Sequence, residues 1–188
     1  DVDGGSILVD GVDTKEMTRH ELRDRFGMVL QDAWLFEGSI RDNIAYAQDN
    51  LPEEKIIAAA RSASVDSFIK TLPGGYDFEL STGAENISQG QRQLLTIARA
   101  MASDPEIMIL DEATSNVDTH TEQLIQKALA KLMHGRTSFV IAHRLSTIRD
   151  ADMILYMEHG DILEHGSHEE LMAQHGKYEA LYMSQFAQ

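Results

Sequence analysis

The chain has 188 residues, of which 43% are hydrophobic and 25% are charged, a balance that is typical of folded globular proteins. Its formal net charge of −15 argues against a general nucleic-acid-binding surface, because such surfaces require an excess of Lys and Arg. With no cysteine, the chain has neither disulfides nor thiolate metal sites, and its apolar runs are far shorter than the roughly 20 residues that span a bilayer.

The first part of the chain contains two predicted strands and a series of helices. Apolar runs over residues 6–9 and 26–30 predict the strands, and a polar helical stretch lies between them. From residue 32 to about residue 103, turns separate short helical patterns. This region is therefore predicted to be an α-helical subdomain.

Three further apolar runs alternate with helices in the second half. They are expected to be strands over residues 107–110, 138–142 and 153–157, buried on both faces because the runs are short and continuous. Thr119 and Glu122 have the spacing of a capping box at the start of an amphipathic helix. This alternation predicts an α/β fold.

The last part of the chain is predicted to contain a hairpin followed by terminal helices. Residues 158–161, Glu-His-Gly-Asp, have the composition of a hairpin turn, and Ser167 and Glu170 have capping-box spacing. The eight histidines are scattered without the spacing of metal ligands, so no structural metal is predicted.

Two adjacent carboxylates, Asp111 and Glu112, follow directly on the apolar run at 107–110. The end of a buried strand is where ligands gather in open α/β sheets. Asp111 suits Mg²⁺, as the Walker-B Asp does in P-loop NTPases, and Glu112 suits an attacking water. Taken alone, the pair is explained more simply as two solvated carboxylates at a strand end.

The segment around Ser88 is the second candidate site. Ser88 and Gln91 have capping-box spacing ahead of a helix that carries apolar residues on one face. In isolation, this segment is simply a well-capped amphipathic helix. Its free N–H groups, the Ser88 hydroxyl and the small Gly90 also form a predicted anion site that suits a γ-phosphate.

Four motifs in a fixed order resemble those of the ATPase domains of ABC exporters. Residues 87–91, Ile-Ser-Gln-Gly-Gln, are similar to the ABC signature, customarily Leu-Ser-Gly-Gly-Gln, with Gln89 in place of the first glycine. The remaining matches are Walker B with the catalytic glutamate at 107–112, the D-loop at 113–118, the switch histidine His143 and the Q-loop glutamine Gln31. The resemblance extends from Gly5 to about Tyr182.

The resemblance implies a P-loop NTPase-like ABC ATPase core, an α/β fold, with an inserted α-helical subdomain. Residues 1–31 would form the remainder of the N-terminal core up to the Q-loop. Residues 32–103 would form the helical subdomain that ends in the signature helix, and residues 104–188 the C-terminal part of the core.

The resemblance also implies ATP and Mg²⁺ as ligands. By resemblance, Asp111 and Gln31 contact Mg²⁺, Glu112 acts on the attacking water, and His143 contacts the γ-phosphate. The signature residues would act in trans, on nucleotide held by a partner subunit, and the D-loop residue would connect the two sites. These residues are Ser88, Gln89, Gly90, Gln91 and, in the D-loop, Asp118.

The implied function is ATP hydrolysis that powers export at the cytoplasmic face of the cell membrane. The implied partners are a transmembrane domain, in the same or a partner chain, and a second nucleotide-binding domain, identical or different; nucleic acid is not among them. Trp34, Phe36 and residues 38–44 resemble the stretch that meets a coupling helix of the membrane domain. The alternative for Trp34 and Phe36 is that they are ordinary core aromatics.

A P-loop sequence, Gly-x-x-x-x-Gly-Lys-Ser/Thr, does not occur in the chain, whose one Gly-Lys pair, Gly176-Lys177, is followed by Tyr178. We therefore expect a fragment that starts after the P-loop helix and cannot hydrolyse ATP alone. Thr82 stands where exporter relatives often carry an acidic residue. Two other readings remain: a catalytically inactive interaction module that uses the signature surface, and a soluble non-transport ABC ATPase.

Overall fold

The computed structural model describes residues 2–46, 48, 50–111, 117–142 and 145–186. The chain divides into two compact units, Asp1–Val140 and Ile141–Gln188. Among the described helices, none combines the length and the apolar content that a segment crossing a membrane needs.

A three-stranded sheet in the order β3-β6-β7 organises the first unit. Its strands are β3 (Phe26–Val29), β6 (Ile107–Asp111) and β7 (Thr137–Ile141). β3 and β6 are parallel, with Phe26 opposite Ile107 and Val29 opposite Leu110. The predicted strands are therefore present, and their ends differ by one residue from the apolar runs.

Only one face of this sheet is covered within the first unit. Val29, Met108 and Leu110 are buried in the main core, to which the two long helices α5 (Gln89–Ser103) and α6 (Thr119–Met133) also contribute. On the other face, Met28 and Phe139 are each 56% exposed. The prediction of burial on both faces, made for the runs at 107–110 and 138–142 in this sheet, is therefore wrong, because burial alternates from residue to residue along β6 and β7.

The segment before β3 is small and mostly exposed. The predicted strand at 6–9 is reduced to β1 (Leu8–Val9), which pairs antiparallel with β2 (Val12–Asp13). The polar helical stretch contains η1 (Thr14–Glu16) and α1 (Arg19–Asp24).

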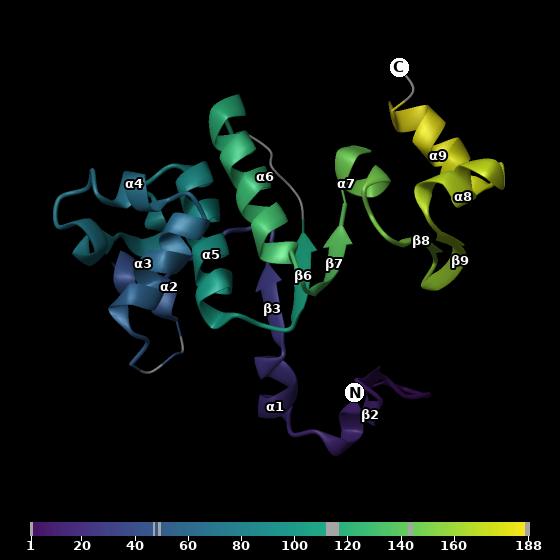
Figure 1. The fold of residues 1–188 in the computed structure, drawn as a ribbon, viewed down its shortest axis with the longest axis horizontal. Coiled ribbons are helices and arrows are strands. Elements are labelled where there is room, and N and C mark those ends of the chain that lie inside the picture. The colour runs from purple at the N-terminus through teal and green to yellow at the C-terminus, as the bar shows by residue number, and fades with distance from the viewer. Residues whose placement is uncertain (1, 47, 49, 112–116, 143–144, 187–188) are drawn as a thin grey trace. The chain divides into compact units, whose positions relative to one another are not determined.

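Helices occupy much of residues 32–103, as predicted, and all of them except α5 are short (Figure 1). They are α2 (Ile40–Ala45), α3 (Glu53–Ser62), α4 (Asp66–Ile69), η2 (Gly75–Asp77), η3 (Thr82–Ala84) and α5. A two-stranded sheet of β4 (Gly38–Ser39) and β5 (Glu79–Leu80) lies among them, which the sequence did not indicate. α2 and α3 pack on α5, so this long helix is the centre of the region.

The N-cap of helix α6 lies one residue earlier than predicted. Asp118 is the N-cap, and its carboxylate accepts a hydrogen bond from the Thr121 N–H at 3.0 Å. The predicted capping box of Thr119 and Glu122 is therefore wrong. Both pairs have the same i, i+3 spacing, and Asp is as good an N-cap as Thr or better.

The described residues of the second unit form a hairpin and three helices. They are α7 (Leu145–Arg149), β8 (Ile154–Glu158), β9 (Asp161–Gly166), α8 (His168–Ala173) and α9 (Lys177–Phe186). The predicted hairpin is confirmed, since Glu158 pairs with Asp161 and both turn residues have positive φ, 53° at His159 and 92° at Gly160. The capping box of Ser167 and Glu170 is also confirmed.

A buried carboxylate joins three elements of the helical region. Asp66 accepts hydrogen bonds from the Tyr76 hydroxyl at 2.8 Å and from Lys70 Nζ at 2.7 Å, and Arg61 lies 3.5 Å away. The Lys70 hydrogen bond is the main cause that holds the pKa of Asp66 below its ordinary value, and burial opposes it. Burial of the Tyr76 hydroxyl, together with its hydrogen bond to Asp66, raises the pKa of Tyr76.

We expect Asp66→Asn to lower the free energy of unfolding by about 2 kcal/mol at neutral pH, because hydrogen bonds to a charged group are lost. The folded pKa of Asp66 lies below the unfolded one, so this contribution is present above the unfolded pKa, about 3.9, and disappears as the pH falls through the folded pKa. Urea unfolding at falling pH should show the two proteins converging. A constant difference down to about pH 2 would contradict this account.

Candidate functional site

Two of the predicted residues lie beyond the same edge of the sheet. Asp111 is the last residue of β6 and is half-buried, and Gln31 follows the end of β3 and is exposed. Because β3 and β6 are parallel, with Val29 opposite Leu110, their carboxyl ends meet at one edge. Carboxylate and amide oxygens are ligands that Mg²⁺ accepts. Glu112 lies outside the described residues.

The start of α5 has the predicted capping box. The Ser88 hydroxyl accepts from the Gln91 N–H at 3.3 Å, and the Gln91 side chain accepts from the Ser88 N–H at 2.8 Å. The backbone N–H groups of Ser88 and Gln91 are therefore already hydrogen-bonded within the cap. The N–H groups of Gln89 and Gly90 have no acceptor among the described residues, and they remain available to an anion at the positive end of the helix.

Gly90 brings the start of α5 against the start of α6. A Cβ at position 90 would collide with Cγ2 of Thr121 and would lie 3.1 Å from Cγ1 of Val117. Gly90 is buried and has ordinary helical conformation, so the glycine is required here by space and not by its backbone angles. The signature segment and the D-loop end are thus in direct contact.

Asp118 has a structural role in addition to its predicted one. Hydrogen bonds from Thr121, first of all from its backbone N–H, hold the pKa of the Asp118 carboxyl below its ordinary value. Its carboxylate is therefore charged near neutral pH and stabilises the positive end of α6. His143 and the D-loop residues 113–116 lie outside the described residues.

The loop before the signature is held by side chains that the sequence analysis did not single out. The side-chain oxygen Oδ1 of Asn86 accepts from the Ser81 N–H at 3.1 Å, and Arg92 donates to the backbone carbonyl of Ala84 at 3.3 Å. The Thr82 hydroxyl donates to Glu37 at 2.5 Å. Position 82 is therefore linked to the segment that follows Gln31 through its hydroxyl rather than through a charge.

An aromatic cluster lies beside α2 and α5. The rings of Trp34, Phe36 and Tyr46 are 6.1–6.2 Å apart, and the Arg99 guanidinium lies 4.5 Å from the Tyr46 ring centroid. Trp34 is 59% exposed and is therefore not a core residue. We call these three rings the aromatic surface. Tyr46 was not predicted, because no sequence period relates it to Trp34.

Asn43 holds the base of the aromatic surface. This side chain is fully buried; its amide donates to the carbonyls of Phe36 and Ser39, both at 3.0 Å, and its oxygen accepts from the Phe36 N–H at 3.1 Å. Arg99 donates to the Asn43 side chain at 3.0 Å, to its carbonyl at 2.8 Å and to the Trp34 carbonyl at 3.1 Å. Burial lowers the pKa of Arg99, and Tyr46 opposes that shift.

The chain is similar to proteins of one family. Residues 1–115 match the family described as ABC transporter. The chain is 54% identical over 182 residues to the ABC transporter ATP-binding protein YfiC of Bacillus subtilis, covering 97% of this chain and 30% of that protein. It is 49% identical over 185 residues to an ATP-dependent lipid A-core flippase of Desulfotalea psychrophila, covering 98% of this chain and 32% of the flippase.

A solved structure gives the same result. A bacterial Atm1-family ABC exporter with ATP bound is 40% identical to this chain, with a TM-score of 0.89 over 100% of this chain and 33% of the exporter. The chain thus spans roughly a third of the length of these relatives. The expected fold is confirmed, and the chain belongs to the ABC transporter family, with the ABC ATPase fold of the P-loop NTPases.

Proposed function

We propose that this chain is the ATP-binding and ATP-hydrolysing part of an ABC exporter and that it powers transport through a transmembrane domain. The observation that carries the proposal is the contact of Gly90 with Thr121. Through this contact, the start of α5, which has two available N–H groups, lies against the end of the D-loop. We also propose the division into core residues 1–31, helical subdomain 32–103 and core residues 104–188.

The residues at the sheet edge fit a magnesium ion. Asp111 and Gln31 supply the carboxylate and amide oxygens that this ion accepts, and both follow parallel neighbouring strands. When bound, Mg²⁺ neutralises negative charge on the phosphates. Among the described residues, no group of three acidic or His side chains forms an all-protein metal site.

The proposed roles of the remaining residues follow from their chemistry. The Glu112 carboxylate accepts a proton from the attacking water, and His143 donates a hydrogen bond to the γ-phosphate. Ser88, Gly90 and Gln91, with Gln89, contact nucleotide that a second nucleotide-binding domain holds, since helix starts bind phosphate. Because the 188 residues contain no P-loop sequence, we propose that the chain alone holds ATP weakly.

The experiment compares ATP turnover by this chain, by the whole product of its gene and by their Glu112→Gln variants. We expect turnover by the whole product to fall at least about 100-fold in Glu112→Gln, because a general base is lost. ATP binding should persist. Glu54→Gln, an exposed carboxylate at the start of α3, is the matched control. Unchanged turnover in Glu112→Gln would overturn the proposed mechanism, and no turnover by either unaltered protein would favour the inactive module.

We propose that the aromatic surface contacts the transmembrane domain, which places the chain at the cytoplasmic face of the membrane. Large exposed aromatic side chains are typical of interfaces. Trp34 has an exposed side chain, lies within 6.2 Å of two other rings and is held in place by Arg99 through its carbonyl. Half-buried Phe36 and exposed Tyr46 extend the same surface.

Trp34 is the only tryptophan of the chain, so its fluorescence reports on this surface. In the isolated chain we expect emission typical of a solvated indole and efficient quenching by acrylamide. In the assembled transporter, with tryptophans of the membrane domain replaced by phenylalanine, the emission should move to shorter wavelength and be protected from the quencher. Equal quenching in both samples would show that the aromatic surface remains exposed to solvent in the assembled transporter.

A further inference from the structure

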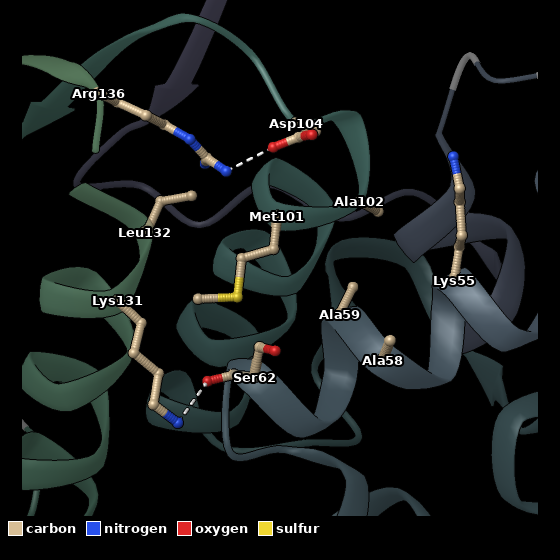
Figure 2. A pocket seen from close by; sticks show the side chains of 10 residues that line it. All are labelled: Lys55, Ala58, Ala59, Ser62, Met101, Ala102, Asp104, Lys131, Leu132 and Arg136. Atoms are coloured by element: carbon tan, nitrogen blue, oxygen red, sulfur yellow. Dashed lines mark hydrogen bonds and ion pairs between the residues drawn. The ribbon is translucent and has the colours of Figure 1, made fainter. Parts of the chain in front are cut away.

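A pocket of about 510 Å³ opens between α3 and the carboxyl-terminal ends of α5 and α6 (Figure 2). Met101, which lines it, follows Gln89 by twelve positions on α5, roughly 18 Å along the helix axis. The pocket is therefore separate from the start of α5. Its volume lies within the range of small-molecule sites.

Part of the pocket lining is apolar, and several of its side chains are small, which leaves the space open. Ala58 and Ala59 contribute from α3 and Ala102 from α5, and the larger Met101 and Leu132 complete the apolar part. Figure 2 shows the Met101 thioether lying across the space between α3 and α6.

The charged residues of the lining are mainly cationic. Lys55, Lys131 and Arg136 contribute three positive charges, and Asp104 contributes one negative charge, in a chain whose net charge is −15. Lys131 Nζ lies 3.4 Å from the Ser62 carbonyl. No carboxylate in the described parts of the chain lies within 4.0 Å of Lys55 or Lys131.

Arg136 has an unmet donor. One terminal nitrogen binds Asp104 at 2.5 Å, whereas its Nη1 is shielded from solvent and has no hydrogen-bond partner among the described residues. Because Asp104 already pairs with Arg136, Lys131, which has no carboxylate partner among the described residues, is the stronger candidate to bind an anion. In Figure 2 the Arg136 guanidinium, beside Asp104, and the Lys131 ammonium, beside Ser62, lie at opposite ends of the lining, with Leu132 and Met101 between them.

The helix ends explain only some of these charges. Lys131 lies in the last turn of α6, where a cation is favourable, and Arg136 follows the same end. Lys55 lies in the first turn of α3, where a cation is unfavourable.

We propose that this pocket binds a small amphipathic anion, with a phosphate or carboxylate head at Lys131 and an apolar part on Met101 and Leu132. The inference does not depend on the proposed ATPase function. The same chemistry is offered by a soluble phosphate ester or carboxylate and by an anionic lipid.

The test uses the whole chain with ¹³C-labelled Met methyl groups, because Met101 lines the pocket and Met28 is exposed on the sheet. Hexyl phosphate and hexanoate should shift the Met101 resonance saturably and leave Met28 unchanged. Hexanol should not shift it, and inorganic phosphate should bind more weakly. If only vesicles of phosphatidylcholine with phosphatidic acid protect Met101, the ligand is the lipid.

Matched variants test whether the anion binds in this pocket. Lys131→Gln should weaken binding about tenfold, because a charge-assisted contact is lost, whereas Lys127→Gln on the same helix should not. Ala58→Trp should block binding with every cation retained. The proposal is overturned if no anion shifts Met101, free or in vesicles, or if Lys131→Gln and Ala58→Trp bind as the unaltered chain does.

Discussion

Gly90→Ala is expected to lower the free energy of unfolding by about 1–3 kcal/mol, the usual cost of forcing an extra methyl group into a packed interior. The added Cβ would collide with Cγ2 of Thr121 and crowd Val117, so these side chains or the starts of α5 and α6 would have to shift. In the whole gene product, ATP turnover should fall as well, because the signature residues share this helix start. Urea unfolding of the chain measures the first effect and phosphate release the second.

A second substitution distinguishes steric conflict from a general loss of helix stability. Thr121→Ser removes the methyl group that the new Cβ would meet and keeps the hydroxyl beside Asp118. In the double variant with Gly90→Ala, we expect much of the lost stability to return. Alanine is the better helix former of the two residues at position 90. Strict additivity of the two changes would therefore mean that the contact between the helix starts is not the cause.

Asn43→Ala should be among the most destabilising single substitutions, at about 3 kcal/mol. It removes a fully buried side chain and leaves the Phe36 N–H and the carbonyls of Phe36 and Ser39 without their partner. Urea unfolding provides the measurement. Gln123→Ala, which removes an exposed amide from α6, is the control and should change stability by less than about 0.5 kcal/mol.

A double-mutant cycle with Arg99→Ala tests whether Asn43 and Arg99 act together. Arg99 donates both to the Asn43 side chain and to its carbonyl, so part of their contributions is shared. We expect the double variant to lose less stability than the two single losses added together. Independent contributions would show that Arg99 stabilises the aromatic surface without Asn43.

Patterns that depend on near neighbours were predicted well from the sequence. The caps at Ser88 and Ser167 and the turn at His159 each involve residues at most three positions apart. The cap of α6 was misplaced because Asp118 and Thr119 both precede a suitable partner by three positions. The spacing alone does not distinguish them.

Contacts between distant residues could not be predicted in this way. Arg99 and Asn43 are 56 positions apart, and Thr82 and Glu37 are 45 positions apart, so no period in the sequence relates them. The strand faces were misjudged for a similar reason. An apolar run has the same composition whether one face or both are covered, and coverage depends on how the helices pack. The roles of Glu112 and His143 stay predictions.

The single helix α5 joins two surfaces for which we propose different tasks. Its first residues carry the signature, and Arg99, further along the same 15-residue helix, holds the carbonyls of Trp34 and Asn43. A hydrogen-bonded helix resists bending over such a length, so it acts as a stiff lever. If two nucleotide-binding domains closed on nucleotide and tilted the first turn of α5, the whole helix would tilt. The aromatic rings would then move with Arg99, and no chain of side-chain rotations would be needed.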